Sequence, residues 1–344
     1  MIGNKHRIGE NMVALLELKQ KLVRIYGKYE TYITPLLRFL LAFVTFMMIN
    51  SSIAYMKAIS KTPIALILAA LCSILPVNVL IMVAAIVVLL DLYALSLEVC
   101  LVGLLLFVFI YFVYFRFAPK NGYNAVLLPV CFKLGIPYIV PVGSGLLTEI
   151  YSVVSVVCGT VVYFFLKGVR ENETTLSSAA SEAESATSKI VIALNQLLKN
   201  KEMFLVVAVF AAATIIVYIV RKMEIDNAWT IAWISGIVFQ TVGLIAGYLL
   251  LGISGKITGV VVGALVSSVI AVIMQFMFFN VDYTRTERLQ FEDDEYFYYV
   301  KAVPKSVITG QDKQLKHFHK NEEKERLTKK KFAEEMDIDE ELLN

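Results

Sequence analysis

The chain has few of the residues that carry catalysis or bind metals. It contains only 3 histidines, and none lies in an apolar segment. The 4 cysteines lie in apolar stretches, without the spacing of a zinc site or a disulfide framework. It has no phosphate-binding loop, no GxSxG motif and no zinc motif of the HExxH type. The sequence therefore predicts no enzyme, no metal site and no cofactor.

Charge is also scarce. Charged residues make up 18% of the chain, and the net charge of +3 gives no sign of nucleic-acid binding. Hydrophobic residues make up 58%, above the roughly 45–50% of soluble domains. Apolar runs of about 20 residues recur, and a run of that length can cross a bilayer as a helix. We therefore expect an all-α, polytopic membrane protein whose main partner is the lipid bilayer.

Apolar length predicts about six transmembrane helices and two interrupted segments. The six are residues 33–55, 98–117, 143–167, 203–221, 228–251 and 257–279. Two other apolar segments, 62–93 and 122–141, contain prolines: Pro76 in the first, and Pro129, Pro137 and Pro141 in the second. An interior proline removes a backbone hydrogen bond, and the resulting pieces are short for crossing a membrane. We therefore predict two re-entrant hairpins that enter and leave on the same side.

The two hairpins share a weak sequence pattern. Asp91 is followed by Tyr93 and then Cys100, and Glu149 is followed at the same spacing by Tyr151 and Cys158. In the predicted topology the two units enter from opposite faces. Inverted repeats with broken helices are common in transporters, so an inverted repeat is one interpretation of the pattern. The alternative is a chance match in an apolar background.

Composition divides the chain into five regions. The predicted regions are a basic amphipathic cytoplasmic helix (1–32), a front membrane bundle with the hairpins (33–167), a polar loop with an interfacial helix (168–202), a three-helix rear membrane bundle (203–279) and a charged cytoplasmic tail (280–344). The basic N-terminal region predicts cytoplasmic termini by the positive-inside rule. A plasma (cell) membrane location is expected.

Small residues recur every four positions in the rear bundle. This spacing lets helix backbones approach closely, so we expect packing of helices, within one chain or in a homo-oligomer. The predicted packing positions are Gly243, Gly247, Gly255, Gly259 and Gly263.

Ionisable residues in the broken segments indicate a polar site within the membrane. A charge at the bilayer centre costs roughly 2.5–3.5 kcal/mol on insertion scales, so such residues usually face a bundle interior or a watery cavity. The candidate pathway residues are Asp91, Lys133, Ser144 and Glu149, with a Lys133–Glu149 ion pair expected. The alternative is a kinked helix that one ion pair stabilises.

Two functions fit these features. The first is a transport protein or permease-like subunit whose pathway lies between the broken hairpins. The second is a membrane scaffold or assembly subunit that recruits a cytosolic protein partner through residues 281–344.

Overall fold

The chain folds as an array of helices. The computed structural model describes residues 2–177, 183–278, 287–292 and 297–302, and the side chains of residues 18–177 and 187–278. The elements are α1 (Ile2–Ser52), α2 (Thr62–Ile74), α3 (Val77–Leu95), α4 (Leu97–Phe117), α5 (Gly122–Lys133), α6 (Ile139–Leu147), α7 (Ser152–Glu171), α8 (Glu173–Ser177), α9 (Ala183–Leu198), α10 (Lys201–Lys222), α11 (Ala228–Leu250), a 3₁₀ turn η1 (Ser254–Lys256), α12 (Ile257–Phe278) and the antiparallel strands β1 (Glu287–Glu292) and β2 (Phe297–Ala302).

The fold is that of a multi-pass membrane protein. Within the described residues, seven helices are long and apolar enough to cross a membrane: α1, α3, α4, α7, α10, α11 and α12. Large apolar side chains point outward on α4, where Leu105, Phe109 and Phe112 are 72%, 65% and 68% exposed. An apolar outer surface of this kind needs lipid around it. The six predicted spans each contribute one of the seven helices, and α3 is the additional one.

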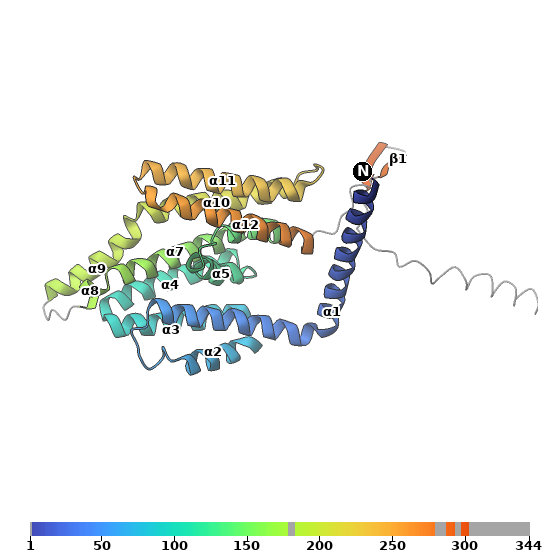
Figure 1. The fold of residues 1–344 in the computed structure, drawn as a ribbon. Coiled ribbons are helices and arrows are strands. Elements are labelled where there is room, and N and C mark those ends of the chain that lie inside the picture. Colours follow the sequence, from blue (N-terminus) through green and yellow to red (C-terminus); the bar gives the residue numbers. More distant parts are fainter. Residues whose placement is uncertain (1, 178–182, 279–286, 293–296, 303–344) are drawn as a thin grey trace, which may run out of the picture.

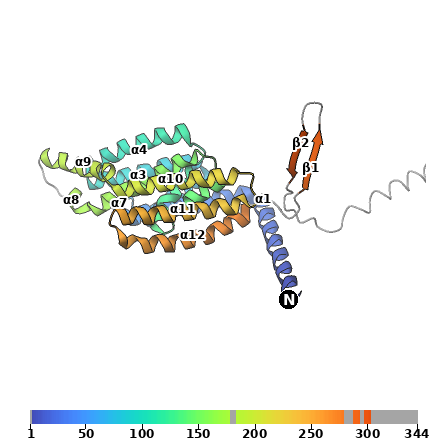
Figure 2. The ribbon, with the colours of Figure 1, turned by 90° about the horizontal axis from the view of Figure 1, so that it is seen from above.

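The helices run roughly side by side in an elongated bundle (Figures 1 and 2). α10, α11 and α12 form one side, α1, α2 and α3 form the other, and α5 and α7 lie between them. The N-terminal half of α1 leaves one end of the bundle, and β1–β2 lies beyond the same end. We call this the N-terminal end. α8 and α9 lie at the opposite end, which we call the far end.

Two apolar clusters hold the bundle together. The front cluster includes Phe46, Leu92 and Phe165, and unites α1–α4 with one face of α7. The rear cluster includes Phe164 and Phe210, and unites α5, α6, α7 and α10–α12. Because Phe164 and Phe165 are adjacent on α7, that helix joins the two clusters. Of the two short helices that the sequence assigned to the front bundle, α6 packs mostly against α10–α12, whereas α5 packs mainly against α7, α1 and α3.

The first broken segment differs from the predicted hairpin. Pro76 does end α2 and begin α3, but α3 alone has 19 residues and is long enough to span. The Ser73 hydroxyl donates to the Pro35 carbonyl at 2.7 Å, and Pro35 lies where α1 enters the bundle. The turn at Pro76 therefore lies near the N-terminal end, opposite the loop that joins α1 to α2. α3 is long enough to span, whereas α2, with 13 residues, is not among the spanning helices, and a re-entrant hairpin is not shown.

The second broken segment forms two short helices, α5 with 12 residues and α6 with 9. Two of its three predicted helix-breaking prolines lie within helices. Pro129 is inside α5, and the freed carbonyl of Ala125 lies against Gly159 of α7. Pro141 is in the first turn of α6, where a backbone N–H has no partner within the helix, so proline is tolerated.

A glycine ends α5. Gly135 has a left-handed φ of +77°, Ile136 N–H donates to Cys131 at 2.9 Å, and Gly135 N–H donates to Phe132 at 3.2 Å. This is the Schellman pattern of helix termination. Pro137 follows it and prevents the helix from continuing. Gly252 ends α11 in the same way, with a φ of +71° and the same two bonds.

The predicted span 143–167 is wrong as a single helix. α6 ends at Leu147 and α7 begins at Ser152, and Glu149 lies in the non-helical turn between them. Glu149 is exposed there, whereas Asp91 is fully buried within α3. The two halves of the proposed inverted repeat therefore differ in structure, and the repeat is not shown.

The glycines of the rear bundle divide into two groups. A Cβ added to Gly247 would lie 2.3 Å from Leu205, and one added to Gly263 would lie 2.4 Å from the Tyr138 ring. A Cβ added to Gly243 would lie 3.3 Å from Val209, closer than most Cβ contacts. Gly255 and Gly259 have nothing within 4 Å, so they take no part in packing within the described chain.

Gly263 and Gly259 provide a matched pair for testing this difference. We expect Gly263→Ala to lower the free energy of unfolding by about 1–3 kcal/mol, because the new methyl would also meet the Gly135 carbonyl at 2.7 Å. Gly259→Ala, on the same helix, should leave stability unchanged or raise it by up to about 1 kcal/mol through helix propensity. Thermal unfolding of the purified protein in detergent measures both, and equal effects would contradict the packing assignment.

Candidate functional site

Asp91 is fully buried and serves the loop after α1. Its Oδ1 accepts the Met56 backbone N–H at 2.9 Å, while Oδ2 has no partner. Tyr55 is beside it, and burial raises the pKa of that phenol to about 12, with the nearby charge of Glu173 adding to the effect. Asp91 therefore holds a loop backbone group at the far end and is separated from the other candidate residues.

Lys133 lies at the end of α5 and contacts α1. Its ammonium donates to the hydroxyls of Ser51 and Ser52, the latter at 2.9 Å. No ion pair among the described residues joins it to Glu149, which lies at the other end of the α5–α6 pair. Because Ser51 and Ser52 end α1, the Lys133 ammonium lies near the far end.

Ser144 is buried in α6, where its hydroxyl donates to the Val140 carbonyl at 2.5 Å. One turn later α6 ends, and Arg221 of α10 donates to the carbonyls of Leu146 and Thr148, the second at 3.2 Å. The guanidinium thus donates hydrogen bonds to carbonyls that the end of α6 leaves without a helix partner. The structure therefore does not bring Asp91, Lys133, Ser144 and Glu149 together in one polar site.

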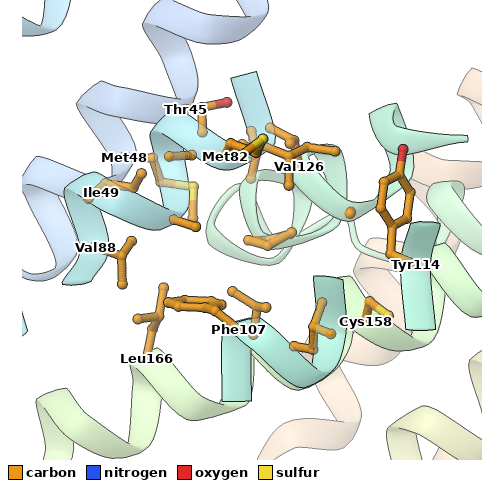
Figure 3. Close-up of a pocket in the computed structure, with 18 of the residues that line it drawn as sticks. Thr45, Met48, Ile49, Met82, Val88, Phe107, Tyr114, Val126, Cys158 and Leu166 are labelled. Atoms are coloured by element: carbon orange, nitrogen blue, oxygen red, sulfur yellow. The ribbon is translucent and has the colours of Figure 1, made fainter. Parts of the chain in front are cut away.

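The cavity beside the broken segment is apolar. It has a volume of about 130 Å³ and lies among α1, α3, α4, α5 and α7 (Figure 3). An engineered cavity of about 150 Å³ with such a lining stays dry and binds benzene. Its wall includes Met48, Val88, Phe107, Val126, Pro129 and Leu166. This is a site for an apolar group rather than for water or a hydrated ion.

No family model matches the chain, and comparisons with curated proteins and with solved structures give no significant match.

A charge cluster at the far end was not anticipated from sequence. Glu202, at the start of α10, accepts from Lys256 at 2.5 Å and from Lys167 at 3.4 Å. It thereby ties α10 to α7 and to the turn before α12. The helix N-terminus that carries Glu202 is capped by Asn200, whose side chain accepts the Met203 N–H at 3.0 Å. Asn200 followed by Glu202 is a helix-start signal that the sequence contains, but it does not identify the two lysines.

We expect Glu202→Gln to destabilise the protein by about 1–3 kcal/mol, between the values for exposed and buried ion pairs, because the Glu202 side chain is only 16% exposed. Glu171→Gln is the control, since Glu171 is 58% exposed and 3.8 Å from Lys167, and should cost less than about 1 kcal/mol. Chemical unfolding in detergent measures both. A cost for Glu202→Gln no larger than that of the control would show that the cluster does not join these helices.

Proposed function

We propose that the chain is a transport protein or permease-like subunit whose pathway follows the α5–α6 pair. One observation carries the proposal. α5 and α6 are each too short to cross a membrane, yet both are largely buried in the bundle, between α1 and α3 on one side and α10–α12 on the other. Broken helices at the junction of two bundles are a recurring arrangement in transporters.

The connections of the pair support a re-entrant segment. Ser155 is near the start of α7. Its hydroxyl donates at 2.7 Å to the carbonyl of Asn121, the residue just before α5. α6 also ends next to the start of α7, with four residues between them. The outer ends of α5 and α6 therefore lie together at the N-terminal end, and the Gly135 turn, where Leu134 and Gly135 are exposed, joins their other ends. The residues of the pathway are then Glu149 at its entrance, Ser144 within it and Lys133 at its inner end, whereas Asp91 stabilises the loop after α1.

The orientation of the protein is part of the proposal. The N-terminal half of α1 and β1–β2 lie at one end of the bundle, which is compatible with both termini on one side (Figure 1). The basic residues before Pro35 favour the cytoplasm for that side. A plasma membrane location fits this arrangement.

A scaffold or assembly subunit is the second candidate. The observation that favours it is the N-terminal half of α1, which leaves the bundle after a kink at Tyr29 and exposes Leu22, Ile25 and Tyr26. Most of the tail that would recruit a cytosolic partner lies outside the described residues. Deletion of residues 281–344 should abolish the function of a scaffold and leave the basal flux of a transporter.

Cysteine accessibility tests the transport proposal directly. In a background without Cys72, Cys100, Cys131 and Cys158, we expect Ser144→Cys to react with an impermeant maleimide from both sides of the membrane. The reason is that a transport cycle opens the pathway to each side in turn, although Ser144 is only 3% exposed in this structure. Labelling would be measured in vesicles of each orientation.

Two further variants make the result unambiguous. Glu149→Cys should label from the side of the N-terminal end in any case, because Glu149 is exposed. Ala42→Cys is equally buried but lies in the front cluster, away from the pair, and should stay unlabelled. Silence of Ser144→Cys from both sides, with Glu149→Cys labelled, would rule out a pathway along α6 and favour the scaffold.

A further inference from the structure

The apolar cavity is elongated along the bundle. Its wall uses residues 81–88 of α3 and 107–114 of α4, which is two turns of each helix. At 1.5 Å per residue, these positions extend over about 10 Å along the helix axes. Lipid chains in a bilayer lie in the same direction, so a linear chain is a better fit to this space than a round group.

Two polar side chains of the wall, Thr45 and Tyr114, already form hydrogen bonds within the protein. Thr45 donates to the Leu41 carbonyl at 2.7 Å, and Tyr114 donates to Asn78 at 2.7 Å and contacts Pro119 O at 3.0 Å. In Figure 3 the labelled side chains that face the space are almost all hydrocarbon or sulfur. None of the partnerless buried polar atoms among the described residues belongs to the wall. Its occupant is therefore apolar.

A cation lies at the far end of this space. Pro129 and Val130 line the cavity, and Lys133 follows them by one helical turn. Its ammonium donates to Ser52, which is itself part of the wall. Lys133 is exposed and forms none of the ion pairs found among the described side chains. The ammonium is therefore available to an anion held above the apolar space.

A second positive charge acts at the same place. The Arg170 guanidinium, near the end of α7, repels the Lys133 ammonium. Glu173 and Arg170 both lie close enough to Tyr55 to affect the pKa of its phenol. The negative charge of Glu173 therefore offsets part of the positive charge of Arg170. The Lys133 ammonium and the two serine hydroxyls match one carboxylate, which accepts several hydrogen bonds.

From these observations we infer that the cavity, which is partly open at the bundle surface, binds a long-chain fatty carboxylate, with its head group on Lys133, the part of the chain nearest the head group among α1, α3, α4, α5 and α7, and the rest of the chain leaving through the opening. The volume of about 130 Å³ favours one chain over the two chains of a phospholipid. The binding stands on the cavity and Lys133 alone. That this molecule is also what the protein transports rests on the proposed function.

Binding can be measured with a fluorescent polyene fatty acid and the full-length protein in detergent. We expect saturable binding that palmitate displaces. Palmitate methyl ester, which has the same chain without the charge, should displace the probe about tenfold more weakly, because a hydrogen bond to a charged group is lost. Displacement by phosphatidylglycerol as good as that by palmitate would show that the site takes a two-chain lipid and would overturn the inference.

Variants locate the site. Lys133→Gln should weaken binding about tenfold, and Lys133→Arg should restore most of it. Lys57→Gln, in the loop after α1, removes a charge elsewhere and should have no effect. Ala85→Phe places a ring in the cavity and should abolish binding, whereas Ala94→Phe, an exposed position on the same helix, should not. Equal binding by Ala85→Phe and Ala94→Phe would place the ligand outside this cavity.

This experiment and the accessibility experiment fail separately. If the probe binds as expected but Ser144→Cys never labels, the site stands and the transport proposal falls. If Ser144→Cys labels from both sides but Ala85→Phe binds the probe normally, transport stands and this ligand is wrong. Ala94→Phe and Lys133→Arg control for misfolding, since each should elute as the same single species as the parent protein.

Discussion

The structure depends on one constraint: each helix break inside a lipid-surrounded bundle leaves backbone groups that need a partner from the protein. The breaks meet this need with side chains from other elements. Arg221 of α10 takes carbonyls at the end of α6, and Gln240 of α11 donates to the Tyr138 carbonyl at 3.0 Å in the turn before it. Asp91 accepts from the loop after α1. The Gly135 turn satisfies itself through its Schellman bonds.

This constraint changes how polar residues in apolar segments should be interpreted. A buried carboxylate or amide in such a segment can hold a broken backbone rather than a substrate. Asp91 and Gln240 both act in this way, and both leave one oxygen without a partner. Lys133 differs, because it donates to side chains at the end of α1 and remains exposed. The sequence marks all such residues equally, since it shows their charge but not the distant group that each one meets.

Local signals predicted the fold better than the site. Apolar length alone indicates a multi-pass helical protein, and it fails where a short helix and a full span follow each other with only four residues between them, as at residues 139–171. The Leu-Gly-Ile sequences at 134–136 and 251–253 mark two helix ends that a search for prolines overlooks. Pro129 and Pro141 show the reverse error, because α5 continues through Pro129 and Pro141 lies in the first turn of α6, where its missing N–H removes no helix bond. The contact of Lys133 with Ser51, which is 82 residues away, has no local signal.

The cavity lies beside residues 125–130 of α5, between that helix and α1, α3, α4 and α7, rather than beyond the end of α5. A protein interior is normally close-packed, and an apolar void loses the contacts that would line it. The small side chains Ala84, Ala85 and Ala125 in the wall keep that void open. A lipid-like chain would restore those contacts without burying polar groups. The lysine that ends α5 would favour a negatively charged head group.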